Sequence, residues 1–291
     1  MQAGSKYRLR VPRAYNIHEL KKIVCGLEET QKIDDLIQKI EFLKTTHFNE
    51  YIMLLQQLGW ITKKNDILRL TCRGKIIQEI SNKSDKLSDD EKSEYLKDFF
   101  SLDFVKKFMI NVFEYDEKLL NNSKKCLTIP EIEEKYHSYR SIGKQASDRE
   151  SRIIYNWLSA LGLLESINFI DIKNNSINVC YHLVKNNISF EEFVKKIKIA
   201  YIKISNSNLQ KGDLLEVEWI NLPTIRRFFC SNFNVSKEVF DANFKKFVEK
   251  YPNLLQLASG SLLRKEVERE GIEINNRIIF YVRLTEGDFN D

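Results

Sequence analysis

The hydrophobic residues of this chain form helical stripes, and two of these stripes end in the same short pattern. Leu54–Ile61 has the sequence Leu-Leu-Gln-Gln-Leu-Gly-Trp-Ile, and Trp157–Leu164 has Trp-Leu-Ser-Ala-Leu-Gly-Leu-Leu. In each copy the apolar helix face ends at a glycine, which can adopt the left-handed conformation that terminates helices. Two short apolar stretches follow, separated by a polar turn at 63–66 or 174–176. This order predicts a winged-helix unit, in which the helix before the hairpin usually enters the DNA major groove.

The first predicted domain is a winged helix over residues 16–80. Apolar residues at helical spacing predict three helices before the hairpin and one after it, and Asn16 is a suitable N-cap for the first. Within residues 1–15, cations alternate with apolar or aromatic residues over 6–15, and Pro12 disfavours a helix there. These residues are predicted to form an extended basic arm.

Residues 81–94 are almost free of apolar side chains and are predicted to form a polar linker. A second winged helix is predicted over residues 95–188, with Ser147 as the N-cap of its recognition helix. Its predicted elements are helical segments over 95–120, a strand at Leu127, a helix starting near Pro130, a helix over 148–161 and a hairpin over 167–181.

The third predicted domain, residues 189–291, is a winged helix with a long charged insertion in its wing at 258–276. Ser236 is a suitable N-cap for its recognition helix, and 278–282 is predicted to be the returning wing strand. The fold class predicted for the whole chain is therefore mainly α with small β-hairpin wings, an α+β class, arranged as tandem winged-helix (helix-turn-helix) domains.

The composition changes this picture little. No apolar run approaches the roughly 18 residues that span a bilayer, and the first residues lack the apolar core of a signal peptide. A cytoplasmic protein without a membrane partner is expected. The five cysteines are widely spread and odd in number, so buried thiols are expected rather than a disulfide or a zinc site. The net charge is +5, and the surplus of cations lies in residues 1–80.

No residue is predicted to be catalytic. The four histidines are far apart in sequence, and the phosphate-binding, dinucleotide-binding, hydrolase and metalloprotease motifs are absent from the chain. Carboxylates near a lysine, as at Asp171 and Lys173, and the pair Glu216 and Glu218 are weak candidates for a metal-dependent nuclease. That nuclease is kept as an alternative, while the main expectation is no metal and no cofactor.

The recognition helix of the second domain has the clearest candidates for DNA contacts. Its apolar stripe, which includes Ile153 and Trp157, leaves other positions for solvent or DNA, namely Ser147, Arg149, Arg152, Tyr155 and Asn156. Arginine can bind guanine through two hydrogen bonds and asparagine can bind adenine. Lys144 and Gln145 precede these positions and are predicted to hold phosphates. The alternative is a solvated helix with a salt bridge between Asp148 and Arg152.

Other cations are predicted to contact the DNA backbone. In the first domain they flank the recognition helix, at Lys63 and Lys64 in the wing and at Arg73 and Lys75 after it. The remaining candidates are Lys6, Arg8, Arg10 and Arg13 in the arm and Arg226, Arg227 and Lys245 in the third domain. The alternatives are a solubilising arm and helix faces used only for packing.

Residues 147–165 resemble the recognition region of FokI-like shifted-cleavage (type IIS) restriction endonucleases. The resemblance implies helix-turn-helix subdomains of winged type that recognise an asymmetric site, while a separate nuclease domain cuts nearby. It also implies that Arg149, Arg152 and Asn156 contact bases. This chain departs from the family because no nuclease domain is evident after the third domain.

The sequence therefore predicts specific binding of double-stranded DNA, as the recognition part of a restriction or defence system. A nuclease domain or subunit is a further expected partner. The alternative is a winged-helix subunit that binds other proteins in a larger complex. DNA binding through phosphate contacts is expected to weaken steeply with salt, which distinguishes the two.

Overall fold

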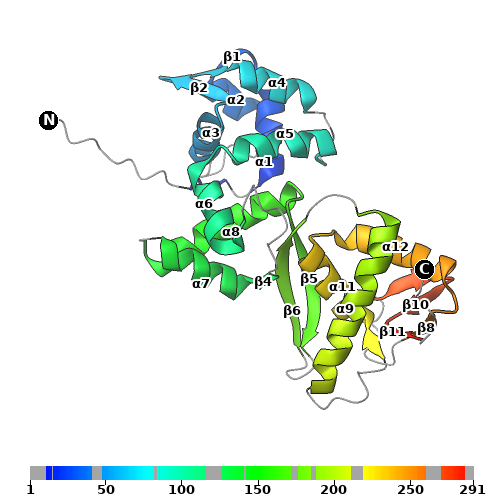
Figure 1. The fold of residues 1–291 in the computed structure, drawn as a ribbon. Coiled ribbons are helices and arrows are strands. Elements are labelled where there is room, and N and C mark those ends of the chain that lie inside the picture. The colour runs from blue at the N-terminus through cyan, green and yellow to red at the C-terminus, as the bar shows by residue number, and fades with distance from the viewer. Residues whose placement is uncertain are drawn as a thin grey trace. The chain divides into compact units, whose positions relative to one another are not determined.

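The computed structural model describes residues 11–14, 16–40, 48–81, 84, 86–115, 126–140, 142–171, 176–184, 188–210, 219–259 and 270–285. The chain is mainly helical with small antiparallel sheets, an α+β class as predicted (Figure 1). Over these ranges no helix combines the length and the apolar character that crossing a membrane requires.

Internal contacts divide the chain into two compact units. The first unit contains Met1–Tyr115 and Pro130–Leu164, and the second contains Asp116–Ile129 and Glu165–Asp291. This division does not follow the boundaries of the three predicted domains.

The N-terminal part of the first unit combines helices with a three-stranded sheet. In chain order its elements are α1 (Ile17–Gly26), β1 (Thr30–Lys32), α2 (Ile33–Lys39), α3 (Phe48–Gln57), β2 (Ile61–Lys64) and β3 (Ile67–Leu70). The last strand lies between the other two, in the order β1-β3-β2. Asn16 caps α1 as predicted, and Gly59 after α3 has φ +72°. The strand β1 was not predicted, because three residues are too short to show alternation.

The same order of elements occurs twice more along the chain. The second copy comprises α6 (Asp103–Phe113), β4 (Leu127–Thr128), α7 (Ile129–Tyr139), α8 (Lys144–Ala160), β5 (Leu164–Asp171) and β6 (Ser176–Leu183). The third comprises α9 (Phe190–Gln210), β7 (Ile220–Asn221), α11 (Leu222–Phe233), α12 (Lys237–Lys250), β8 (Leu255–Ala258) and β11 (Tyr281–Leu284). Their sheets have the orders β4-β6-β5 and β7-β11-β8, so the last strand is central each time.

The three copies differ in how they are distributed between the compact units. The first copy lies within the first unit and the third within the second unit. In the second copy, α6, α8 and nearly all of α7 belong to the first unit, whereas β4, β6 and nearly all of β5 belong to the second. The same order of elements therefore occurs three times along the chain, although the chain forms two compact units.

The predicted linker over 81–94 is wrong for its second half, which begins the helix α5 (Asp89–Phe99). Ser88 and Glu91 form a reciprocal capping box at its start, a pattern present in the sequence. Glu91 is fully buried and forms a salt bridge with Lys21 of α1, at 2.7 Å. The high charge of this stretch suggested exposure to solvent. The start of α5 is instead held by a salt bridge to a residue distant in sequence.

The strands of the third copy also differ from the wing that the sequence predicted. The returning strand is β11, whereas Arg277–Ile279 forms β10 and pairs with β9 (Ile272–Ile274). Asn275 and Asn276 connect these two strands with positive φ angles of 49° and 60°. The inserted segment therefore ends in a small hairpin of its own.

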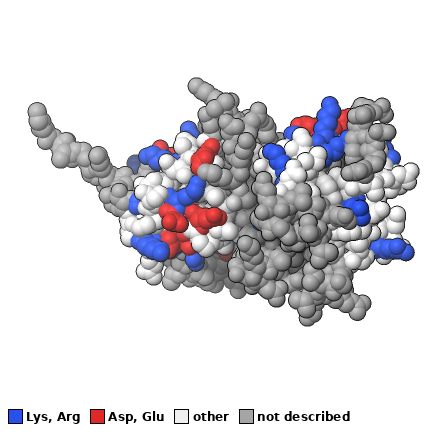
Figure 2. Space-filling view, turned by 60° about the horizontal axis from the view of Figure 1, so that its bottom comes forward, with Lys and Arg blue, Asp and Glu red and all other residues white. Residues whose placement is uncertain are grey.

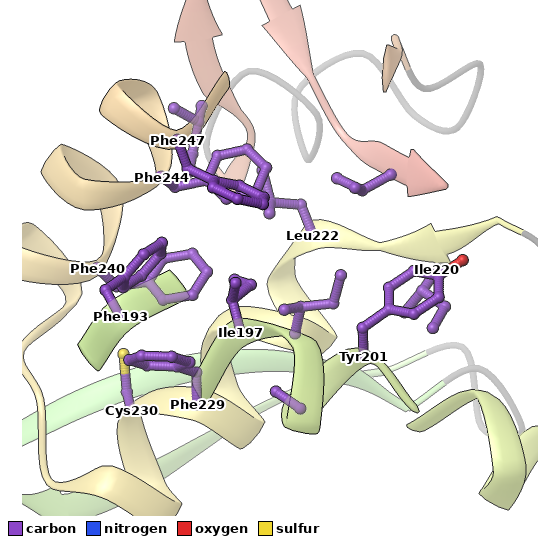
Figure 3. Packing of buried hydrophobic residues seen from close by; sticks show 14 of the residues in the cluster. Phe193, Ile197, Tyr201, Ile220, Leu222, Phe229, Cys230, Phe240, Phe244 and Phe247 are labelled. Carbon is purple, nitrogen blue, oxygen red and sulfur yellow. The ribbon is translucent and has the colours of Figure 1, made fainter. Parts of the chain in front are cut away.

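The core of the second unit is rich in phenylalanine (Figure 3). Phe193 of α9 lies 5.0 Å from Phe229 of α11 and 5.6 Å from Phe240 of α12, measured between ring centroids. All three side chains are fully buried. The Phe193–Phe240 pair is edge-to-face and the Phe193–Phe229 pair is tilted. Aromatic contacts of this kind stabilise packing beyond the burial of apolar area, so they hold the three helices against one another.

The prediction that the chain has no disulfide is wrong, because Cys126 and Cys180 are bonded, with their Cα atoms 5.5 Å apart. Cys126 directly precedes β4, and Thr128 of β4 pairs with Cys180 of β6. Strand pairing brings the two cysteines together across 54 residues of sequence, which spacing alone does not reveal. The expectation of a buried thiol is confirmed for Cys230, whereas Cys25 and Cys72 are exposed.

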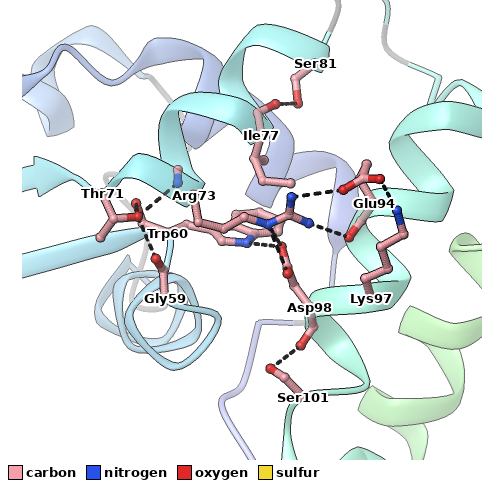
Figure 4. A network of polar contacts seen from close by, with 11 residues as sticks. Gly59, Trp60, Thr71, Arg73, Ile77, Ser81, Glu94, Lys97, Asp98 and Ser101 are labelled. Atoms are coloured by element: carbon pink, nitrogen blue, oxygen red, sulfur yellow. Dashed lines mark hydrogen bonds and ion pairs between the residues drawn. The ribbon is translucent and has the colours of Figure 1, made fainter.

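The helix α4 (Cys72–Ile80) closes the first sheet and is fixed by a polar network (Figure 4). Arg73 donates from Nε to both oxygens of Asp98, at 2.8 and 3.0 Å, and from Nη1 to Glu94 at 2.9 Å. Trp60 donates from Nε1 to the same Asp98 carboxylate at 2.7 Å. The network joins two segments to α5, namely α4 and Trp60, the residue directly before β2.

Replacing Gly74 with alanine is expected to destabilise the first unit by a net ~2 kcal/mol, because overpacking outweighs the better helix propensity of alanine. A Cβ atom at Gly74 would lie 1.9 Å from the carbonyl oxygen of Trp60, which is backbone and cannot rotate away. Chemical denaturation measures the change. Gly143→Ala is the control, since a Cβ there meets nothing within 4 Å. Equal stabilities of the two variants would contradict the close approach at Gly74.

Candidate nucleic-acid interface

The helix α8 presents one polar stripe on the side away from its buried face. Its buried positions include Ile153, Ile154, Trp157 and Leu158, all without exposed area. On the opposite side lie four positions at helical spacing, namely Gln145, Arg149, Arg152 and Asn156. At 1.5 Å per residue this stripe extends about 16 Å along the helix. We refer to these four residues as the α8 stripe.

Two buried contacts fix α8 within the first unit. Glu150 accepts hydrogen bonds from the Tyr136 hydroxyl at 2.9 Å and from Nη2 of Arg140 at 2.8 Å, both from the region of α7. Trp157 donates from Nε1 to the carbonyl oxygen of Ala14 at 2.5 Å. Burial raises the pKa of Tyr136 well above its usual range, so the hydroxyl stays a donor at physiological pH. The α8 stripe therefore projects from a helix that is held at several points.

The sequence candidates on α8 fall into three groups. Lys144, Gln145 and Asn156 are exposed, and Arg149 is partly buried without a hydrogen bond or ion pair to any described residue. Arg152 is exposed, and its Nε donates to Glu133 of α7 at 2.6 Å. The expected alternative partner, Asp148, does not form this salt bridge.

Three predictions on α8 are wrong, two for Ser147 and one for Tyr155. Ser147 is fully buried, and it does not cap the helix, because α8 begins at Lys144 with Gly143 as its N-cap. Tyr155 is also buried, with 5% of its surface exposed. Since the helix starts earlier than predicted, Ser147 lies in its first turns on the packed side.

The first sheet carries a group of exposed cations at the end near its hairpin turn. Lys63 and Lys64 of β2 are exposed, as the prediction requires. Lys32 of β1 and Lys64 both pair with Ile67 of β3, and Arg69 lies two residues further along β3. None of these cations forms a salt bridge with a described residue. We call Lys32, Lys63, Lys64 and Arg69 the wing cations.

The wing cations are not part of a broad basic surface. Exposed carboxylates lie close to them along the chain, at Asp34, Asp35 and Asp66. In the view of Figure 2, cations and carboxylates are interspersed among the described residues. Contacts to a polyanion are therefore expected to be few and local, in agreement with the small net charge of the chain.

Several predicted phosphate contacts are engaged within the protein instead. Arg73 is held by Asp98 and Glu94, and Lys75 forms a salt bridge with Glu29 at 2.5 Å. These two cations lie on α4, where acidic partners from other segments reach them. They are less available to phosphates than the wing cations.

The prediction that Arg226 contacts the DNA backbone does not fit the structure, since 1% of its side chain is exposed. Its Nε donates to Asp241 of α12 at 2.7 Å, and its Nη1 donates to the carbonyl oxygen of Glu270 at 3.1 Å. Arg227 is partly buried, and burial lowers the pKa of its guanidinium. Lys245 of α12 is exposed as predicted.

The basic arm is described only at its end. Lys6, Arg8 and Arg10 lie outside the described residues, as do the nuclease candidates Glu216 and Glu218. The end of the predicted arm does not extend freely, because Val11 and Ala14 are buried. Arg13 is partly buried, and its backbone N–H donates to Glu50 of α3 at 2.8 Å.

The structure also adds residues that the sequence did not indicate. Lys32 and Arg69 join the candidate interface because β1 pairs with β3, and β1 was not predicted. Glu133 joins it as the partner of Arg152, 19 residues away in sequence. Sequence spacing held no signal for that pair, because it depends on how α7 and α8 cross.

Comparisons with known proteins give little further information. No protein-family model and no curated protein matches the sequence. Among solved structures, the restriction endonuclease FokI is similar, with a TM-score of 0.26 and 14% sequence identity. The similarity covers 91% of this chain and 53% of that chain, so the chain spans about half of the FokI structure. These values describe a loose structural relation.

Proposed function

We propose that the protein binds double-stranded DNA in a sequence-specific manner and that the α8 stripe enters the major groove. The observation that carries this proposal is the stripe itself, in which two arginines and two amides share one face of a well-anchored helix. Arginine matches guanine, and asparagine or glutamine matches adenine, at major-groove edges. The three copies of the helix and sheet order are interpreted as winged helices, with α3, α8 and α12 before their hairpins.

The wing cations and Lys144 supply backbone contacts in this proposal. They are exposed and form no salt bridge with described residues, so binding a phosphate breaks no ion pair within the described part of the chain. Phosphate contacts set the position of a protein on the duplex, while base contacts supply specificity. The biological role proposed is target recognition in a restriction or defence system, with cleavage performed by a nuclease partner.

Affinity for duplex DNA is expected to fall about 100- to 1,000-fold between about 50 and 200 mM salt, which corresponds to about five phosphate contacts. Fluorescence anisotropy with a labelled duplex measures this slope. Lys64→Ala is expected to weaken all duplexes evenly and to reduce the slope by about one. Affinity that does not depend on salt would remove the backbone contacts from the proposal.

Arg149→Ala is expected to cost about 1–3 kcal/mol at the preferred site and much less at unrelated duplexes, because it removes a base contact. The preferred site comes from selection of bound duplexes out of a random pool. Arg149 is the sharper test because it makes no hydrogen bond or ion pair with a described residue in the free protein. An equal loss on every duplex would show that Arg149 contacts phosphate only.

A protein-binding subunit is the second candidate function. It is favoured by two exposed isoleucines on α9, Ile199 and Ile202, whose exposed fractions are 46% and 56%. They lie on one helix face in the second unit, where apolar area is available for a partner. Failure of the protein to bind any duplex at low salt would favour this function over DNA recognition.

A further inference from the structure

The salt bridge between Arg152 and Glu133 uses only part of the arginine side chain. Nε donates to Oε1 of Glu133 at 2.6 Å, whereas the two terminal nitrogens make no hydrogen bond with a described residue. The side chain of Glu133 is 16% exposed and that of Arg152 is 57% exposed. The carboxylate is therefore the fixed partner, on α7, and the guanidinium extends from it toward solvent.

Anchoring Nε has a geometric consequence for the rest of the guanidinium. The group is planar and rigid, so fixing one nitrogen restricts the directions that the other two can take. The edge that carries both terminal nitrogens matches the O6 and N7 acceptors of guanine. A long side chain that is ordered before binding loses less entropy when DNA arrives.

We infer that Glu133 is a positioning residue that holds Arg152 for two-point recognition of a guanine. The inference rests on the proposed DNA binding and names one base and one residue that the proposal does not. Two other roles make different predictions. If the salt bridge is only structural, removing Glu133 leaves base preference unchanged. The loss of stability is then also small, because exposed ion pairs contribute little to stability. A competing salt bridge, which DNA must break, makes removal of Glu133 increase affinity for the preferred guanine.

The test begins with duplexes selected by the wild-type protein from a random pool. The guanine bound by Arg152 is the one whose replacement by 7-deazaguanine, which lacks the N7 acceptor, weakens the wild type but not Arg152→Ala. Discrimination is then the ratio of affinities for the guanine and 7-deazaguanine duplexes. For the wild type a ratio of about 5 to 150 is expected.

Glu133→Ala is expected to lower this ratio by at least about 5-fold, while Glu133→Gln retains part of it, because the amide oxygen still accepts from Nε. Glu134→Ala is the matched control, since it removes an exposed carboxylate from the adjacent position of α7, and that carboxylate has no partner among the described residues. The control is expected to keep the wild-type ratio. Thermal unfolding of each variant confirms that it is folded.

The outcomes separate the inference from the proposed function. Absence of any duplex binding by the wild type overturns both. DNA binding with an unchanged ratio in Glu133→Ala overturns the inference alone, and so does a ratio that rises. Loss of discrimination in Glu133→Ala with partial recovery in Glu133→Gln supports it, provided that the base preference assigned to Arg149 is unaffected.

Discussion

Replacing Arg226 with methionine is expected to destabilise the second unit by about 3–5 kcal/mol, the cost of removing one partner from a buried ion pair. Methionine keeps most of the side-chain volume, so the loss reports the charge. Asp241 then loses its hydrogen bond from Nε. Glu270, whose side chain is 6% exposed, loses Nη1 of Arg226 and keeps Nζ of Lys237, both of which lie 3.7 Å from its carboxylate. Urea denaturation followed by fluorescence measures the change.

The pH dependence of this loss has a definite sign. Burial raises the pKa of Asp241 above its ordinary value, and Arg226 opposes that rise. Without Arg226 the folded-state pKa rises further above that of the unfolded chain. A carboxyl with a raised folded-state pKa binds a proton more readily when folded, so stability increases as pH falls toward the unfolded pKa. The difference between wild type and Arg226→Met is therefore expected to shrink between about pH 7 and about pH 4.

Two further variants control this experiment. Lys246→Ala removes one exposed cation from α12 and is expected to change stability little. Asp241→Asn combined with Arg226→Met is expected to recover part of the loss, since the carboxylate that lost its arginine partner is then neutral. A loss below about 1 kcal/mol in Arg226→Met, with no pH dependence, would contradict the buried salt bridge.

Removing the disulfide by replacing Cys126 and Cys180 with alanine is expected to lower the free energy of unfolding by about 2–4 kcal/mol. The bond closes a loop of 54 residues, and cross-linking a loop of this length restricts the unfolded chain. It also holds β4, a short strand paired with β6, in the second unit. Thermal unfolding with and without a reductant measures the same effect in the unmodified chain.

The other cysteines provide the comparison. Cys72→Ala removes an exposed thiol and is expected to leave the unfolding transition unchanged. Thiol titration of the denatured, unreduced protein is expected to count the three free cysteines, Cys25, Cys72 and Cys230. A count of five thiols would show that Cys126 and Cys180 are reduced, and the reductant would then have no effect.

Local sequence patterns predicted the ends of helices correctly where the signal lies within a few residues of the helix end. The caps at Asn16 and Ser236 and the glycines after α3 and α8 occupy the predicted conformations. Each of these features depends on hydrogen bonds or backbone angles within a few residues. The capping box at Ser88 belongs to the same class, although the charge of its surroundings led to a linker prediction.

The candidate site was predicted only in part, because exposure depends on neighbours from other segments. Helical spacing placed Arg149, Arg152 and Asn156 on one face, and the structure keeps them there. It buries Ser147, because the helix starts earlier than the cap pattern indicated. The sequence does not show whether an arginine in a helix faces water or a carboxylate from another segment, so it could not predict the burial of Arg226.

The sequence by itself determined most of the helices and the hairpins that follow α3 and α8, because periodicity, caps and turns act over short distances. Only the tertiary structure decided which cations remain free of salt bridges, which cysteines are bonded and which carboxylate holds Arg152. Those outcomes depend on pairs separated by tens of residues, such as Cys126 with Cys180 and Arg226 with Glu270. Such pairs form when elements pack, and no local pattern encodes them.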